Sequence, residues 1–410
     1  MDITITDQQR RVLLIIGFVL ITLVMIVAVW WVFFTPIGET PLVNTNGNVN
    51  GGRLPTTNVP TGSGVITNTA PPDARLPKIE DRATGGLTIA TPLVDAIVRD
   101  AKRVGEELRY YDPKTGKFYK ILADGTIVEL SSKIFRGVKE VVWAPRRNEA
   151  ILNFPDGQNI LYNFDEGAQY NLPKELEEIR FSGSGEKIGF KFIGSGRENQ
   201  WLGFSSPQGT SVKVIDLLGD HADRVDVNWS PSDEVVATLE VPLSGDRQEL
   251  QFVGQNQENF FSTIVEGYGL DSLWSPNGRQ LLYSVYRSED DYRPRLWMVD
   301  AQGEEIGKTR RDLGLITWAR KCTFSSQSGV IYCGVPKNLQ EGAGILPHLV
   351  ESRDTLYRID LNRGAREEIA LPVKADRSDA FDIEQLFLSP NEDQLWFTNA
   401  LDGKIYKVQL

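Results

Sequence analysis

Few residues of this chain have the chemistry for acid–base catalysis or metal binding. Histidine is the commonest general acid–base, and the 410 residues include two, His221 and His348. His221 lies between Asp220 and Asp223, where a solvated loop is the simpler interpretation and a metal site the alternative. The acidic run 289–291 lacks calcium-ligand spacing and is interpreted as a hairpin tip. No zinc, EF-hand or P-loop motif and no Gly-x-Ser-x-Gly elbow occurs. We therefore predict no catalytic, metal-binding or cofactor-binding residue.

The two cysteines, Cys322 and Cys333, are placed for covalent pairing. They flank the turn residues 326–329 almost symmetrically, so we expect them to face each other on adjacent antiparallel strands. A Cα separation of about 4.5–5.5 Å across such a pair suits a disulfide. The alternative is two small buried thiols. Metal binding is disfavoured, because two cysteines without a nearby histidine cannot complete a tetrahedral site.

A third candidate is the apolar stretch within residues 336–352. It contains Ile345, Leu346, His348 and Leu349 in a segment that interrupts the β pattern described next. Long loops on rigid scaffolds often bind partners. We predict a partner-binding surface here, with a loop that folds back onto its own strands as the alternative.

A short phrase that recurs six times predicts the elements that carry these residues. Each copy has an aromatic residue or Leu, then Ser or Ala, a turn rich in Pro, Gly and Asn, and a run of β-forming residues. The copies begin at Trp143, Phe181, Trp229, Trp274, Phe324 and Leu388. Their spacings are 38, 48, 45, 50 and 64 residues, mostly near the ~40–50 residues of a propeller blade.

The repeat predicts an all-β propeller of about seven four-stranded blades, with six or eight as alternatives. Three strand-like runs at 108–111, 118–121 and 126–130 add a partial blade before the first phrase. The last unit ends after only three strands, so an N-terminal strand is expected to close the ring, with Leu87–Ile89 as a candidate. The apolar spacing within 92–104 predicts a short helix packed against the propeller.

An apolar run from Val12 to Phe34 predicts a transmembrane helix. It would span about 34 Å as a helix, enough to cross a bilayer. A cleaved signal peptide is the alternative, but the run is long for one and no small-residue cleavage site follows. Arg10 and Arg11 precede the span. This favours a single pass through the cell membrane, with a cytoplasmic N-terminus (residues 1–11) and an extracytoplasmic propeller.

The region between the span and the repeats is rich in Thr, Pro, Gly and Asn. Residues 35–85 therefore predict a disordered tether. Residues 86–104 would form a short helix or strand that leads into the propeller at 105–410.

Two of the repeats carry a family resemblance. The units WSPSDEVVAT from Trp229 and WSPNGRQLLY from Trp274 closely resemble the WD40-like propeller repeat of TolB-type proteins. The resemblance covers roughly residues 105–410 and implies the propeller fold. The span, the tether and the cysteine-bearing blade also resemble bacterial membrane-anchored propeller proteins of uncharacterised function. The chain departs from TolB in having an anchor and tether in place of a small α/β domain, so no Tol-system partner is carried over.

Charge and motif content favour a binding role. The formal net charge of −11 repels phosphate backbones, so nucleic acid is not an expected partner. We expect a membrane-tethered, non-enzymatic propeller that binds an envelope protein or polymer and needs no cofactor. The alternative is an extracytoplasmic carbohydrate-active lyase or hydrolase, with carboxylates or tyrosines gathered at the central funnel.

Overall fold

The computed structural model describes residue 25, residues 77–377 and residues 381–410. The described residues from 77 onward belong to one compact unit. The predicted span 12–34, apart from Met25, and most of the predicted tether lie outside the described residues. Among those described, no helix is long and apolar enough to cross a membrane.

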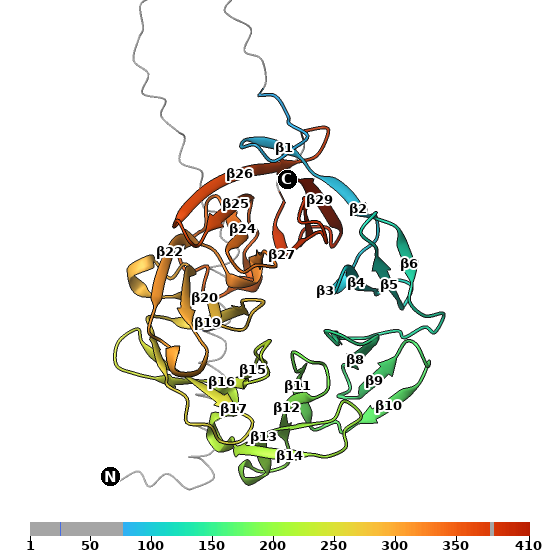
Figure 1. Cartoon of the computed structure of the whole chain (residues 1–410), viewed down its shortest axis with the longest axis vertical. Helices are drawn as coiled ribbons and strands as arrows, with labels where there is room; N and C mark the ends of the chain where they lie inside the picture. Colours follow the sequence, from blue (N-terminus) through green and yellow to red (C-terminus); the bar gives the residue numbers. More distant parts are fainter. Residues whose placement is uncertain (1–24, 26–76, 378–380) are drawn as a thin grey trace, which may run out of the picture. The chain divides into compact units, whose positions relative to one another are not determined.

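The compact unit is a ring of seven blades, each a four-stranded antiparallel set (Figure 1). Sequence reasoning predicted this class and blade number, and both are confirmed. Apolar clusters fill the spaces between neighbouring blades, such as the one that joins Phe118 of the first blade to Trp143 of the second. In chain order the first three blades are β3 (Arg99–Val104), β4 (Glu107–Asp112), β5 (Lys117–Ile121) and β6 (Ile127–Glu129); β7 (Glu140–Trp143), β8 (Glu149–Asn153), β9 (Asn159–Asn163) and β10 (Gln169–Leu172); and β11 (Leu176–Phe181), β12 (Ile188–Ile193), β13 (Gln200–Ser205) and β14 (Lys213–Leu217).

The remaining blades follow the same plan, with the first strand of each innermost (Figure 1). They are β15 (Val225–Val227), β16 (Val235–Pro242), β17 (Gln248–Gly254) and β18 (Thr263–Val265); β19 (Tyr268–Trp274), β20 (Gln280–Tyr286), β21 (Arg295–Asp300) and β22 (Arg310–Ile316); β23 (Cys322–Phe324), β24 (Val330–Pro336), β25 (Asp354–Asp360) and β26 (Ala365–Val373); and β27 (Ile383–Leu388), β28 (Gln394–Asn399) and β29 (Ile405–Gln409) with an N-terminal strand.

The N-terminal strand that closes the ring is β2 (Thr91–Val94), which pairs antiparallel with β29. The candidate Leu87–Ile89 is instead β1, which adds a fifth, parallel strand to blade six through β26. The prediction that an N-terminal strand closes the ring is therefore confirmed, but the strand is β2 and not Leu87–Ile89. The last residues of the predicted tether are structured, because Glu80 bridges Thr88 and the Ala83 amide donates to the Gln409 carbonyl.

The helix expected within 92–104 does not form, because these residues supply β2 and β3. A register shift between Arg99 and Lys102, with Asp100 at a φ of 50°, interrupts the alternation of β3. Ala101 and Val104, three residues apart, are consequently both buried. A bulged strand thus imitates the apolar spacing of a helix.

The recurring phrase has three separate structural roles. Its Ser hydroxyl accepts a hydrogen bond from the amide five residues later, as in Ser230 with Val235 (3.0 Å) and Ser275 with Gln280 (2.9 Å). In two copies its Trp indole donates to a carbonyl in the innermost strand region of the preceding blade, from Trp143 to Asp100 (2.7 Å) and from Trp274 to Asn228 (3.2 Å). Its turn packs on the next turn, where a Cβ at Gly183 would lie 2.5 Å from the Pro231 carbonyl. The phrase therefore joins blades as well as marking them.

Candidate functional site

The insertion between β24 and β25 presents three large apolar side chains to solvent. Ile345 and Leu346 are each 50% exposed and Leu349 is 69% exposed. We call these three residues the apolar knob. His348 is also exposed and lies with Leu349 in the 3-10 helix η6 (Pro347–Leu349). The role of this loop in binding stays a prediction.

One side of the insertion is anchored on the neighbouring fifth blade. The Gly342 amide donates to the Asp291 carbonyl (2.9 Å) and the Gly344 amide donates to the Tyr292 carbonyl (2.8 Å). Ala343, between them, is buried. A Cβ at Gly344 would lie 2.5 Å from the Cβ of Tyr286, so only glycine permits this close approach.

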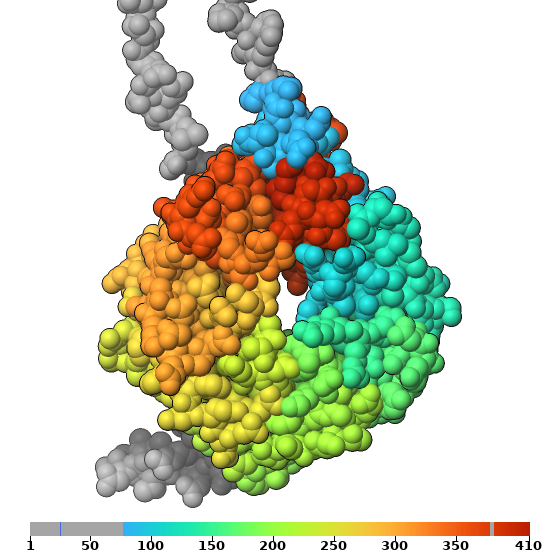
Figure 2. Space-filling view, viewed as in Figure 1, coloured from blue at the N-terminus to red at the C-terminus, as the bar shows by residue number. Residues whose placement is uncertain are grey.

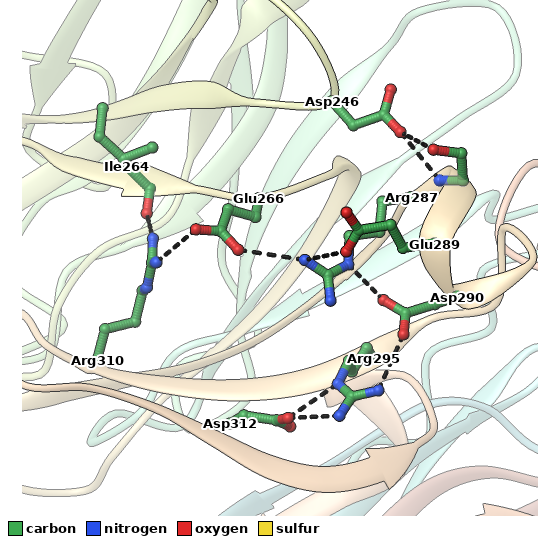
Figure 3. A network of polar contacts seen from close by, with 10 residues as sticks. Asp246, Ile264, Glu266, Arg287, Glu289, Asp290, Arg295, Arg310 and Asp312 are labelled. Carbon is green, nitrogen blue, oxygen red and sulfur yellow. Dashed lines mark hydrogen bonds and ion pairs between the residues drawn. The ribbon is translucent and has the colours of Figure 1, made fainter.

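The turn that receives the insertion is held by charged side chains (Figure 3). It contains the 3-10 helix η3 (Ser288–Asp290), at the hairpin tip predicted from the acidic run. The Asp290 side chain is only 8% exposed and accepts from Arg287 Nε (2.6 Å) and Arg295 Nη1 (2.9 Å). Asp246 of the preceding blade accepts from the amide and hydroxyl of Ser288 (3.0 and 2.6 Å). These hydrogen bonds lower the pKa of Asp246.

Further ion pairs extend this network to the outer strands of blade five (Figure 3). Glu266 joins Arg287 (3.2 Å) to Arg310 (2.8 Å), and Arg295 also pairs with Asp312 (2.5 Å). Burial works to raise the pKa of Asp312, but the hydrogen bonds from Arg295 and the Gly314 amide, together with the positive charges of Arg295 and Arg287, lower it overall. Asp312 therefore stays ionised at neutral pH and keeps its ion pair with Arg295.

The other end of the insertion is anchored by a buried charge cluster. Lys321, in the 3-10 helix η5 (Ala319–Lys321), donates to Asp354 Oδ2 (2.8 Å), Asp382 Oδ1 (2.6 Å) and Ser352 Oγ (3.0 Å). Lys321, Asp354 and Asp382 are all at least nine-tenths buried. Burial raises the pKa of Asp354 despite the opposing effect of Lys321. The cluster ties the end of the insertion to blades six and seven.

The predicted disulfide between Cys322 and Cys333 is confirmed. The two residues are direct cross-strand partners of β23 and β24, with a Cα separation of 4.0 Å. Cys322 follows Lys321, and β24 leads into the insertion. The disulfide therefore links β23, which follows Lys321, to β24, which leads into the insertion.

Several titratable groups lie on the innermost strands of the ring. Asp226 of β15 and Asp271 of β19 both have raised pKa values, mainly because of burial. The negative charge of Glu178 on β11 adds to the effect at Asp226. Burial also raises the pKa of Asp100 on β3 to about 6. The innermost strands of three blades thus contribute carboxyl groups with raised pKa values, and Glu178 on the innermost strand of a fourth blade helps to raise one of them.

The other histidine does not join these groups. His221 is exposed in the 3-10 helix η2 (Gly219–Arg224), in the inter-blade loop expected from sequence. Its neighbour Asp220 pairs with Arg197 (2.6 Å). Within the described part of the chain, no group of three or more His, Cys, Asp or Glu side chains is arranged to hold a metal ion.

Comparisons with known proteins identify the architecture. No protein-family model and no curated protein sequence matches this chain. Among solved structures, the propeller domain of Cps50 (Swd1) from Myceliophteria thermophila is similar over 78% of this chain and 100% of its own, with a TM-score of 0.52 and 11% identity. The tricorn protease gives a TM-score of 0.50 at 12% identity over 78% of this chain. These similarities establish the fold.

Other similarities carry less weight. The match to the tricorn protease spans 34% of that protein's length. An oligogalacturonate lyase in complex with manganese matches with a TM-score of 0.49 at 12% identity, covering 78% of this chain and 93% of its own.

Sequence reasoning found the knob and the cysteines but missed the residues that hold the loop. Asp290 was assigned to a hairpin tip without partners, and Lys321, Asp354 and Asp382 were not singled out. Lys321 is 33 and 61 residues from its two carboxylates. One signal was available, since a charged residue directly before a predicted buried cysteine pair needs a partner.

Proposed function

We propose that this protein is a membrane-tethered, extracytoplasmic propeller that binds an envelope protein or polymer without catalysing a reaction. In this role the apolar knob is the contact surface, and the rigid ring presents it. The polar, acidic remainder of the ring keeps the head soluble beside the membrane.

The observation that carries the proposal is the fixed exposure of the knob. Ile345, Leu346 and Leu349 remain exposed although their loop is held in place. It is hydrogen-bonded to blade five at Gly342 and Gly344 and to the buried Lys321 at Ser352. Large exposed apolar groups on a soluble surface are typical of interaction sites. Because the loop is already ordered, binding loses little further conformational entropy.

The test uses the full chain in its native membranes. The double variant Leu346→Asp/Leu349→Asp should abolish a cross-linked complex that the unaltered chain forms in pull-downs. Leu217→Asp is the matched control, because Leu217 on β14 is 69% exposed, like Leu349, but lies outside the insertion. Undiminished capture by the double variant, or equal loss in the control, would show that the knob is not the binding surface.

A second candidate function rests on the carboxyl groups around the centre of the ring. The raised pKa values of Asp100, Asp226 and Asp271 are those expected of groups suited to proton transfer in a polysaccharide lyase or hydrolase. Assays of the full chain against envelope and plant polysaccharides would detect this activity. If activity were found, Asp226→Asn and Asp271→Asn should each remove it, and activity that survives both substitutions would reject this site.

A further inference from the structure

A cavity of about 480 Å³ lies at the centre of the ring, on the side where the phrase turns meet. Innermost-strand regions of blades one, five, six and seven line it, and Figure 2 shows the ring open at its centre. The lining includes Lys102 and Arg103 of β3, Leu273 of β19, Thr323 of β23 and Phe387 of β27. This volume falls within the range of about 300–1,000 Å³ typical of small-molecule sites.

The charge of this cavity has a single sign. Lys102 and Arg103 are its two charged lining residues, and none of the lining residues is acidic. This is unusual in a chain whose formal net charge is −11. The carboxyl groups with raised pKa values described above belong to other residues of the ring.

The Lys102 ammonium has no hydrogen bond or ion pair with any residue that the structure describes, and the side chain is accessible to solvent. The protein that surrounds this ammonium removes part of its hydration and thereby lowers its pKa, and the positive charge of Arg180 lowers the pKa further. Arg103 donates from Nε to the Gly105 carbonyl (3.0 Å), which leaves the Nη groups of its guanidinium for other acceptors. An anion that entered the cavity would therefore meet one unpaired ammonium and part of one guanidinium.

We propose that this cavity binds a small organic carboxylate, with the carboxylate on Lys102 and Arg103 and the apolar part against Leu273 and Phe387. The Thr323 hydroxyl is a further possible donor at the edge of the same cavity. This site is separate from the apolar knob and does not depend on the proposed function.

A carboxylate fits better than a phosphate ester for an electrostatic reason. The acidic chain repels anions at long range, and a dianion is repelled more strongly than a monoanion. Burial also disfavours two charges more than one. The apolar lining adds affinity for an organic group that an inorganic anion would not gain.

The experiment measures binding of 2-naphthoate to the full chain by its fluorescence. The neutral isostere 2-naphthamide tests the role of charge, and 2-naphthyl phosphate and inorganic phosphate test the choice of anion. Lys102→Gln removes the unpaired ammonium, and Lys102→Arg keeps a positive charge at the same position. Lys114→Gln is the matched control, because Lys114 is an exposed lysine in the β4–β5 turn.

The expected result is saturable binding of 2-naphthoate that weakens at least about tenfold in Lys102→Gln, because a charge-assisted hydrogen bond is lost. Lys102→Arg and Lys114→Gln should bind within about twofold of the unaltered chain, and 2-naphthamide should bind at least tenfold more weakly. No saturable binding of 2-naphthoate, equal binding of the amide, or full affinity in Lys102→Gln would overturn the proposal. Tighter binding of 2-naphthyl phosphate would overturn the assignment of a carboxylate.

Discussion

Substitution of Lys321 by Met should strongly destabilise the propeller. Met removes the ammonium while keeping a long apolar side chain, so little volume is lost. Asp354 and Asp382 would then lie buried with no opposite charge, after having accepted bonds of 2.8 and 2.6 Å from the same nitrogen. Breaking a buried ion pair by removing one partner typically costs about 3–5 kcal/mol. We expect a loss in that range at pH 7.

The penalty should depend on pH in a defined direction. Burial already raises the pKa of Asp354, and removal of Lys321 would raise it further. A carboxyl group whose pKa is higher in the folded state than in the unfolded state favours folding at low pH and loses that contribution as pH rises through the folded-state pKa. The loss in Lys321→Met should therefore be smaller near pH 4 than at pH 7.

Urea unfolding of the full chain, followed by tryptophan fluorescence, measures this free-energy difference. Lys308→Met is the control, because Lys308 pairs with Glu305 (2.7 Å) at the surface and its removal should cause no resolved change. A loss below about 1 kcal/mol at pH 7 would refute the reasoning that Lys321 neutralises two buried carboxylates. An equal loss at pH 4 and pH 7 would refute the titration argument.

Three further predictions follow from other contacts. Replacing both Cys322 and Cys333 by Ser should lower the free energy of unfolding by about 2–3 kcal/mol in urea titrations, because the bond closes a short loop. The Asp100 carboxyl, with a pKa of about 6, stabilises the fold at low pH and loses this contribution as pH rises. The free energies of unfolding of Asp100→Asn and the unaltered chain should therefore differ by an amount that changes by up to about 3 kcal/mol between pH 4 and pH 7. Parallel pH profiles of the two proteins would contradict this. Gly344→Ala should detach the insertion from Tyr286 and speed amide exchange at residues 342 and 344, whereas Gly329→Ala, where the Cβ would lie 3.4 Å from Asn362 Nδ2, should leave that exchange unchanged.

The blades were predictable because their signal is local and repeated. Each phrase begins with a large apolar residue and contains a turn, and five of the six have a Ser that accepts from an amide five residues later, all within ten residues. Repetition then removes the ambiguity that a single short β run would leave. The disulfide was predictable for the same reason, because a hairpin turn sets which residues face each other.

The errors arose where tertiary contacts override a local pattern. Ala101 and Val104 follow helical spacing, but β3 is required as the innermost strand of the first blade, and its bulge accommodates the spacing. Leu87–Ile89 has the composition of the closing strand, yet the edge of β29 is occupied by β2. Which of two neighbouring β segments pairs with a distant edge depends on chain path, and a local sequence pattern does not report it.

The anchors of the insertion were unpredictable for a different reason. Their charges come from segments far apart in the chain, as with Asp246 and Ser288, which are 42 residues apart. A pair of opposite charges at such a separation has no distinguishing spacing, and most charged residues are solvated. Lys321 and Asp290 differ from other charged residues only in being buried. Which charged residues are buried depends on the fold, so the sequence alone does not single them out.

The knob and the cavity lie toward opposite ends of β24, which makes the two proposals separable. Val330 begins this strand next to a phrase turn and Pro336 ends it at the insertion. Seven residues of strand extend about 20 Å, so neither set of side chains reaches the other. Leu346→Asp/Leu349→Asp should therefore leave 2-naphthoate affinity unchanged, and Lys102→Gln should leave cross-linked capture unchanged. Coupling between them would require β24 to shift as a unit, which the buried bond from Cys333 to Cys322 and the pairing of β24 with β23 and β25 oppose.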